Sequence, residues 1–290
     1  MNEINELLKK YNIKPISYRR KGKVLIINNE IVIKENNIDP KILEYLNNRN
    51  INYLPDTIFD SKYLITKYEE DSDIPSEQKI IDLIDLISQI HNKTSFYKEE
   101  ASFDYKTIYE DLLNNYNYLY EYYSEYINKI DDKVFYSPSE FLLSRNISYI
   151  FKSIEEGKKY IESWYKEVEN INKMRVSVIH NNLDLTHFIR NKKSFLISFD
   201  KSKIDIPVFD LYKLYNKYYL DFNFNELIKR YEKDYKLSDS ERKLLFILIL
   251  MPSKIERTNE YDMCINISNE IDRLYKSYIF IEQYKESTKN

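Results

Sequence analysis

The chain has 290 residues, of which 43% are hydrophobic and 31% charged, a composition typical of a globular protein with a substantial core. Its net charge of −3, without a strong basic block, argues against a general nucleic-acid-binding protein. The single cysteine, Cys264, excludes a disulfide framework, and two glycines, Gly22 and Gly157, are too few for a Walker loop or a Rossmann fingerprint.

The N-terminal residues contain no apolar core of the signal-peptide type. The densest apolar run, 244–251, is far shorter than the about 20 residues that a membrane-spanning helix needs. Together with the single cysteine, these features predict a cytoplasmic protein that has neither a membrane nor a nucleic acid as its partner.

The first 70 residues are predicted to be rich in strands. Asn28-Asn29 tolerates the positive φ angles of a tight turn, and Asp39-Pro40 has the residue types of a helix N-cap and first helical position. One helix is expected to begin at Asp39-Pro40 and to end at about residue 48. Strands are expected at 15–23, 24–28, 30–35, 51–59 and 63–68. The acidic stretch 69–73 is a candidate hinge.

The rest of the chain is predicted to be mainly helical. Apolar residues at helical spacing begin at Ile80 and extend to His91, and a tyrosine-rich helix is expected over about 104–129. Cap signals then open further helices, at Ser137 to Glu140, at Asn223 with Glu226, and at Ser238 with Glu241. A final helix is expected over about 261–285.

A β island interrupts the helical part at 175–200. The strand 175–179 precedes the polar segment 180–187, and two further short strands, 188–190 and 195–199, are expected to form a hairpin. Polar residues held between short strands are a common layout for a functional site.

The segment 179–215 resembles the aminoglycoside phosphotransferase and choline kinase group of the protein-kinase-like superfamily, and most of all the bacterial spore-coat kinase-like proteins. Those proteins carry H-G-D-x-x-x-x-N, then I-D-F-D, then a downstream D-L. In this chain the matching frames contain IHNNLDLTH, ISFD and, at Asp210, DL. The resemblance implies an α+β, two-lobed kinase-like fold, with a small antiparallel β-rich lobe at 1–70 and a large, mainly helical lobe at 71–290.

The same resemblance assigns roles to single residues. Lys34, in the third predicted strand, would bind the phosphates of a nucleotide, and its carboxylate partner would be Glu44 or Asp39 from the next helix. His180 and Asp210 would be structural, with Asp210 bonding backbone amides of the loop that contains the first motif.

Three positions depart from the family pattern. Asn182 stands in place of the catalytic Asp, and an amide accepts no proton at neutral pH. His187 and Ser198 stand in place of the metal-binding Asn and Asp, and a hydroxyl carries no charge to balance Mg²⁺. Two carboxylates would rescue the site. Asp184 would replace the lost catalytic Asp. Asp200, the second acid of the I-D-F-D frame, is a candidate metal and cofactor ligand.

These departures favour a non-catalytic kinase-like protein that needs no cofactor and acts by binding or scaffolding. The resemblance makes a sporulation or spore-coat protein the expected partner, with a spore-associated location. An active phosphotransferase, transferring from ATP with Mg²⁺ to an alcohol group through altered metal ligands, is the main alternative. A third hypothesis is a tyrosine-rich interaction module that works through the helix 104–129.

Overall fold

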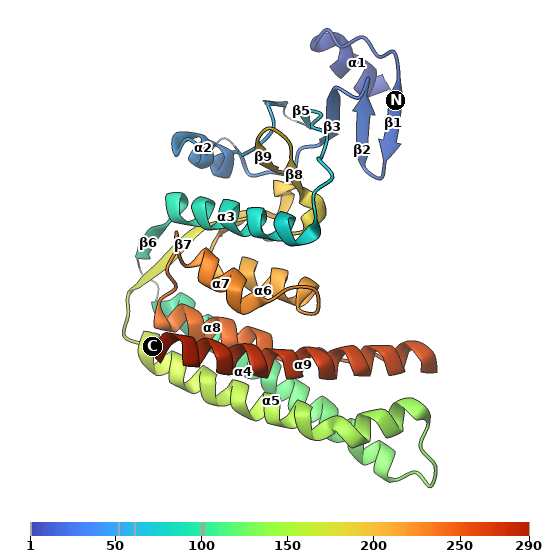
Figure 1. The fold of residues 1–290 in the computed structure, drawn as a ribbon, viewed down its shortest axis with the longest axis vertical. Helices are drawn as coiled ribbons and strands as arrows, with labels where there is room; N and C mark the ends of the chain where they lie inside the picture. Colours follow the sequence, from blue (N-terminus) through green and yellow to red (C-terminus); the bar gives the residue numbers. More distant parts are fainter. Residues whose placement is uncertain (1, 52, 61, 100–101, 290) are drawn as a thin grey trace. The chain divides into compact units, whose positions relative to one another are not determined.

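The computed structural model describes residues 2–51, 53–60, 62–99 and 102–289 (Figure 1). The chain divides into two compact units, which we call the N-terminal unit, Met1–Leu86 with His180–Lys203, and the C-terminal unit, Ile87–Ile179 with Ile204–Asn290. One boundary therefore falls inside helix α3 (Ser76–Thr94). The division into lobes at residue 70 stays a prediction, and the loop 180–203 groups with the N-terminal residues.

The N-terminal unit contains an antiparallel sheet whose strand order is β1-β2-β3-β5-β4. The five strands are β1 (Tyr18–Lys21), β2 (Val24–Ile27), β3 (Ile31–Glu35), β4 (Thr57–Phe59) and β5 (Tyr63–Lys67). Asn28 and Asn29 join β2 to β3 with φ angles of 55° and 54°, which confirms the predicted tight turn. Gly22, with φ of 60°, lies between β1 and β2.

The sheet is apolar on both faces. Alternate residues, such as Ile27, Ile33 and Ile65, pack on one face against Leu7 and Leu8 of helix α1 (Asn2–Lys10). The register places Ile26 beside Val32 and Lys34 beside Leu64 on the opposite face. Helix α1 was not predicted. Its apolar stripe is short, and the sheet face on which that stripe packs cannot be identified from the sequence.

Helix α2 (Pro40–Asn48) begins as predicted, with the Asp39 carboxylate accepting a bond of 2.9 Å from the Lys41 amide. The strand predicted over 51–59 is shorter in the structure, where only β4 (Thr57–Phe59) is regular. Pro55 lies in the missing part and has no N–H to donate to a sheet. Residue 52 lies outside the described residues.

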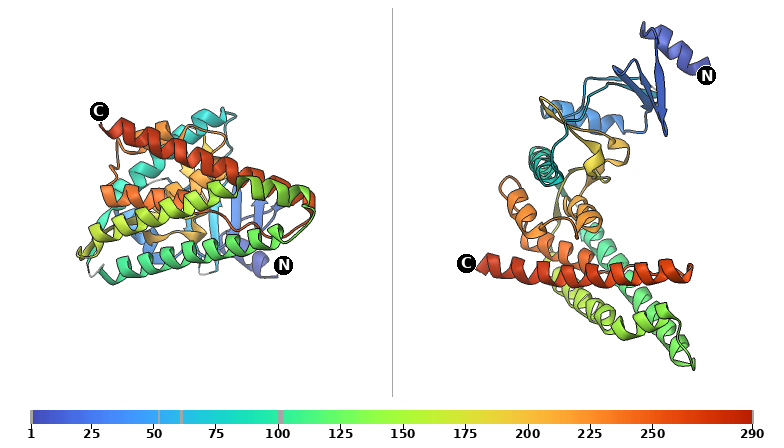
Figure 2. Two further views of the ribbon diagram at one scale, coloured as in Figure 1. Left: turned by 90° about the horizontal axis from the view of Figure 1, so that it is seen from below. Right: turned by 45° about the vertical axis from the view of Figure 1, so that its right-hand side comes forward.

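The C-terminal unit is mainly helical. Helices α4 (Ser102–Asp131) and α5 (Pro138–Val168) form a long hairpin, and α5 packs on both α8 and α9 (Figure 2). The other helices that start in this unit are α6 (Val208–Tyr218), α7 (Phe224–Tyr231), α8 (Asp239–Leu250) and α9 (Glu260–Lys289). Among the described residues, no helix is both long and apolar enough to cross a membrane.

Cap residues begin three of these helices as predicted. Ser137 with Glu140, and Ser238 with Glu241, form complete capping boxes, and the Asn223 side chain accepts a bond from the Asn225 amide. A small sheet of order β10-β7-β6 accompanies the helices. It consists of β6 (Phe96–Glu99), which was not predicted, β7 (Lys173–Ile179) and β10 (Lys203–Asp205).

The tyrosines of α4 serve mainly as packing groups. Tyr116 and Tyr123 are fully buried, and their hydroxyls donate bonds of 2.6 and 2.5 Å to the carbonyls of Ile247 and Ser253. A buried phenol needs such an acceptor. The tyrosine-rich helix therefore holds the α-helical unit together, which weakens the hypothesis that it is the working surface.

Replacing Gly157 with alanine should destabilise the protein by about 1–3 kcal/mol, because an added Cβ would collide with the buried ring of Tyr116. Denaturant unfolding followed by circular dichroism measures the change. Gly22→Asn is the control, since open space surrounds Gly22 and Asn tolerates its positive φ. Equal stability of Gly157→Ala and the native protein would contradict the packing described here.

Candidate functional site

A cavity of about 720 Å³ lies within the N-terminal unit. The sheet face opposite α1 forms one side of it, with Val24, Ile26, Val32, Lys34, Leu64 and Thr66. The β8 and β9 hairpin and the residues after it contribute Ile189, Ile197 and Phe199. Strands β8 (Phe188–Arg190) and β9 (Ser194–Leu196) are the hairpin predicted from the sequence. The cavity thus joins the first strands to the motif segment, far apart in the chain.

Backbone hydrogen bonds attach the hairpin to the rest of the unit. The Leu196 amide donates to the Tyr53 carbonyl at 2.8 Å, and the Ser72 amide donates to the Arg190 carbonyl at 2.7 Å. The Asp71 carboxylate also accepts a bond of 2.8 Å from the Arg190 amide. These bonds explain why the hairpin groups with the N-terminal residues, and they tie the predicted hinge to it.

Lys34 and Asp200 meet in this unit. The Lys34 ammonium donates to both carboxylate oxygens of Asp200, at 3.0 and 2.9 Å. Their side chains are 17% and 33% exposed, so the pair is only partly hydrated. Both were candidate ligands of a nucleotide, and in the structure they bind each other.

Glu44 is not the partner of Lys34, and this expectation was wrong. Helix α2 buries Ile42, Leu43 and Leu46 against the unit, which leaves Glu44 on the exposed face of the helix. The other candidate, Asp39, caps α2. The sequence offered no signal for Asp200 as the partner, because the two residues are 166 positions apart.

The polar segment 180–187 contains a left-handed residue near its start. Asn181 stands at the glycine of the family pattern and has φ of 61°, a left-handed conformation that asparagine tolerates. The His180 imidazole donates to the Ile197 carbonyl at 2.8 Å and meets the Phe199 ring edge to face. These contacts fix the loop beside the residues that follow β9.

The other predicted site residues are held by local bonds. His187 lines the cavity, and its Nδ1 bonds the carbonyl of Asn182 at 2.9 Å. Asp184 caps the short helix η1 (Leu185–His187), because one of its oxygens accepts 2.8 Å bonds from both the amide and the hydroxyl of Thr186. That oxygen is therefore committed to the turn, which disfavours Asp184 as a replacement base or ligand.

Ser198 lines the cavity with φ of 68°, and it precedes the short helix η2 (Phe199–Lys201) without capping it. Its hydroxyl, the His187 imidazole and the paired Asp200 carboxylate are a poor set for Mg²⁺, which prefers carboxylates and phosphate oxygens. Among the described residues, no cluster of three or more His, Cys, Asp or Glu side chains is suited to a metal ion. The residues present do not fit the magnesium site of a kinase.

Asp210 lies fully buried at the start of α6 in the C-terminal unit. Its carboxylate is 3.3 Å from Nε2 of His91, whose Nδ1 is 2.7 Å from the Tyr231 hydroxyl. Burial raises the pKa of Tyr231 well above its ordinary value, so its hydroxyl stays protonated beside Nδ1 of His91. The predicted bonds from Asp210 to loop amides stay a prediction.

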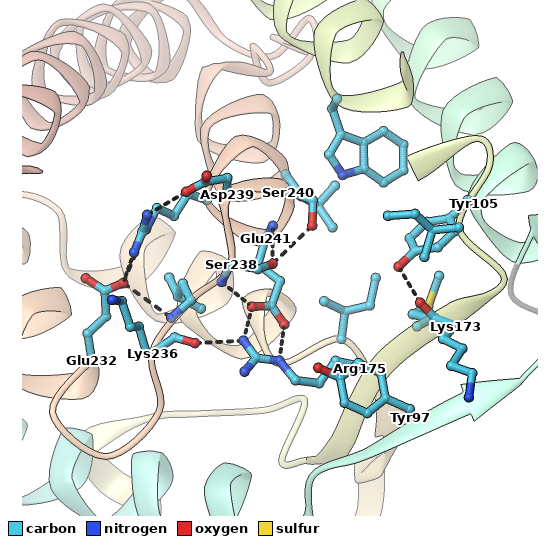
Figure 3. A pocket seen from close by; sticks show the side chains of 17 residues that line it. Tyr97, Tyr105, Lys173, Arg175, Glu232, Lys236, Ser238, Asp239, Ser240 and Glu241 are labelled. Carbon is cyan, nitrogen blue, oxygen red and sulfur yellow. Dashed lines mark hydrogen bonds and ion pairs between the residues drawn. The ribbon is translucent and has the colours of Figure 1, made fainter. Parts of the chain in front are cut away.

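A larger hollow, of about 900 Å³, lies in the C-terminal unit (Figure 3). Arg175 donates to both oxygens of Glu241 and to the Lys236 carbonyl, while Arg242 is ion-paired with Glu232 and Asp239. Trp164, also in the lining, packs edge to face on Tyr105. The charged groups of this hollow join β7 and the end of α7 to α8, and it contains none of the predicted site residues.

Comparison with known proteins bears on the fold. No family model and no curated protein match the chain. Among solved structures, an aminoglycoside phosphotransferase from Alicyclobacillus acidocaldarius subsp. acidocaldarius superposes with a TM-score of 0.72 over 97% of this chain and 95% of its own, at 10% identity. The chain has a kinase-like fold.

Two further structures agree on the fold. The AMP-bound complex of a spectinomycin phosphotransferase has a TM-score of 0.53 over 98% of this chain and 94% of its own, at 13% identity. A glucosamine kinase has a TM-score of 0.51 over 93% of this chain and 77% of its own, at 8% identity. The likeness confirms the predicted architecture of an antiparallel sheet followed by a helical lobe.

Asn181→Ala should destabilise the protein by about 1–2 kcal/mol more than Asn181→Gly. Both variants lose the bond from the Asn181 amide group to the Lys201 carbonyl, so their difference isolates the cost of a Cβ at positive φ without a compensating side chain. Urea unfolding of the two variants measures it. Equal stability of the two would show that residue 181 is not left-handed in solution.

Proposed function

We propose that this protein is a non-catalytic member of the kinase-like fold that acts by binding and not by phosphoryl transfer. The observation that carries the proposal is the pairing of Lys34 with Asp200. The lysine expected to hold phosphates and the carboxylate best placed to hold a metal neutralise each other. Neither is available to a Mg²⁺–nucleotide unless their ion pair is broken.

The missing groups point the same way. Phosphoryl transfer in this fold depends on positioning and charge, which come from a metal ion and from a carboxylate at the attacking hydroxyl. Loss of general-base help alone typically lowers the rate by about 10²–10⁴-fold, and Asn182 accepts no proton. Ser198 adds no charge where the metal-binding acid is expected, and Asp184 is occupied in a turn.

A binding role also has a surface that fits it. The loop between α4 and α5 exposes Val134 and Phe135 at 88% and 86% of their area, with Tyr136 and Phe141 beside them. Large exposed apolar side chains in one place are typical of a protein–protein contact. A protein partner is therefore part of the proposal, and its assignment to sporulation or the spore coat stays a prediction.

An active small-molecule phosphotransferase is the second candidate, and the names of the structural neighbours favour it. They include an aminoglycoside phosphotransferase, a spectinomycin phosphotransferase and a glucosamine kinase. In that case the protein would use ATP with Mg²⁺, and Asp200 would have to leave Lys34 to act as a metal ligand.

Incubation with ATP and Mg²⁺ and a panel of amino-sugar, aminocyclitol and amino-alcohol acceptors should yield no phosphorylated product and no ADP above the blank. Mass spectrometry of the acceptors and a coupled ADP assay measure this. Product formation that Asp200→Ala abolishes would overturn the proposal and establish the second candidate.

The triple variant Asn182→Asp, His187→Asn and Ser198→Asp restores the family residues in the frame of the motif. It should gain Mg²⁺-dependent ATP binding that the native protein lacks, because a carboxylate at 198 and an amide oxygen at 187 would then be available to the cation. Thermal shift with ATP, with and without Mg²⁺, measures the gain by mass action. A native protein that already shows the Mg²⁺-dependent shift would contradict the loss of the metal site.

A further inference from the structure

Strand β1 forms a free edge of the sheet in the N-terminal unit. The strand order β1-β2-β3-β5-β4 leaves one side of β1 without a neighbouring strand among the described residues. On its other side, β1 is paired antiparallel with β2 over all four of its residues. A row of unpaired backbone N–H and C=O groups on an edge strand is a template for another extended chain. The sheet can therefore accept a further strand at β1.

The outward-facing backbone groups of this edge belong to Tyr18 and Arg20. The Asn28 amide donates to the Ser17 carbonyl at 2.9 Å, which makes these two residues a hydrogen-bonded pair between the two strands. Bonded and non-bonded pairs alternate along an antiparallel ladder, so Tyr18 and Arg20 fall in the non-bonded positions. Their amides and carbonyls therefore point away from β2 and supply two donors and two acceptors at the free edge.

The side chains along this edge are basic and lack acidic partners. Residues 11–29 contain five basic residues and no acidic one. Arg19, Arg20 and Lys21 are exposed, and none of them makes an ion pair with any other part of the chain that the structure describes. Their neighbours on β2, Val24–Ile27, are all apolar, so the adjoining strand offers them no carboxylate. The positive charge of β1 is available to a partner.

The order of side chains along β1 indicates what such a partner would carry. Successive residues of a strand alternate between faces, so Arg19 and Lys21 project to one face and Arg20 to the other. On an added strand, the side chains opposite these residues would have Cβ atoms about 4.5–5.5 Å away. Acidic residues at adjacent positions would therefore meet all three. Ile16 and Tyr18, which are 93% and 77% exposed, favour an apolar residue beside those acids.

We propose that the free edge of β1 binds an extended, acidic segment of a partner protein, which adds to the sheet as a further strand. The backbone of that segment would bond the outward groups of Tyr18 and Arg20, and its carboxylates would face Arg19, Arg20 and Lys21. The inference goes beyond the proposed function, because it holds whether or not the protein transfers phosphate. It also concerns a different surface from the loop between α4 and α5.

The same features disfavour other occupants of the edge. A second copy of the chain, pairing β1 with β1, would bring two sets of exposed arginine and lysine side chains together, and like charges in opposite positions destabilise a ladder. A nucleic acid has no backbone N–H to donate to the outward carbonyls of Tyr18 and Arg20. The basic patch is also confined to a short segment of a chain whose net charge is −3, so it attracts a long polyanion only weakly.

Fluorescence anisotropy of the full chain with labelled peptides tests the inference. The probe is a peptide of about ten residues that has adjacent glutamates between β-branched residues. One comparison peptide has glutamine at every glutamate, and another keeps the glutamates but is N-methylated at each of them. The probe should bind at least about tenfold more tightly than either, because the first lacks the charge and the second lacks the strand-forming amides.

Three results of this titration would overturn the inference. The first is no binding of the acidic probe, which would leave the basic residues as protection of the edge against aggregation. The second is equal binding of the probe and its N-methylated form, which would show attraction between charges without strand pairing. The third is tighter binding of a single-stranded oligonucleotide than of the acidic probe. None of these results bears on phosphoryl transfer.

A double variant tests the part that charge plays. Arg20→Gln with Lys21→Gln should raise the Kd of the acidic probe at least about tenfold and leave that of the glutamine peptide unchanged. The matched control is Lys229→Gln with Lys276→Gln, which removes the same charge from exposed helical positions of the C-terminal unit. Equal effects of the two double variants would contradict a site at β1.

Tyr18→Pro tests the part that the backbone plays without a change of charge. Proline removes the outward N–H and is tolerated in an edge strand where that N–H faces solvent. The variant should bind the acidic probe at least about fivefold more weakly than Tyr18→Thr, which keeps the N–H. Circular dichroism verifies that both variants fold. Equal Kd values for the two would show that the peptide does not pair with β1 and would overturn the inference.

Discussion

The ion pair between Lys34 and Asp200 is the contact on which the account of this protein depends. It connects the middle strand of the sheet to the residues that follow β9, across 166 positions of sequence. Both groups are partly withdrawn from water, so each needs the other to offset its desolvation. In an active kinase-like cleft, a lysine in this place would bind a phosphate and an acid in this place would bind the metal ion. Here the two groups neutralise each other.

The motif segments around this pair contain left-handed residues and a histidine that joins them. Asn181, at the glycine of the family pattern, is left-handed, and Ser198 is left-handed where the chain enters η2. His180 still joins the loop to the Ile197 carbonyl. The cavity is formed although Asn182, His187 and Ser198 stand where the family pattern has its catalytic and metal-binding residues. The proposed binding function would require the cavity and not the catalytic groups.

Much of the architecture followed from local signals in the sequence. The structure contains the predicted turn at Asn28-Asn29 and the predicted helix caps at Asp39, Ser137 and Ser238. A turn or a cap is determined by a few neighbouring residues, so the sequence alone predicts it. The resemblance around 179–215 supplied the order of the two lobes, which the solved structures confirm.

Long-range partners were the part that sequence reasoning missed. Helix α1 and strand β6 are short, and each is stabilised by a surface formed elsewhere in the chain. Lys34 and Asp200 were both chosen as site residues, but their pairing depends on how β3 and η2 come together in three dimensions. The assignment of Glu44 failed for the same reason, since the buried face of α2 was not known.

The most direct test of the central claim is electron paramagnetic resonance of Mn²⁺ with ATP, in the presence and absence of the protein. Mn²⁺ binds the same oxygen ligands as Mg²⁺, and its paramagnetic resonance spectrum changes when its ligands change. The account predicts that an excess of protein leaves the spectrum of the Mn²⁺–ATP complex unchanged. A protein-dependent change in that spectrum, lost in Asp200→Ala, would show a working metal site and contradict it.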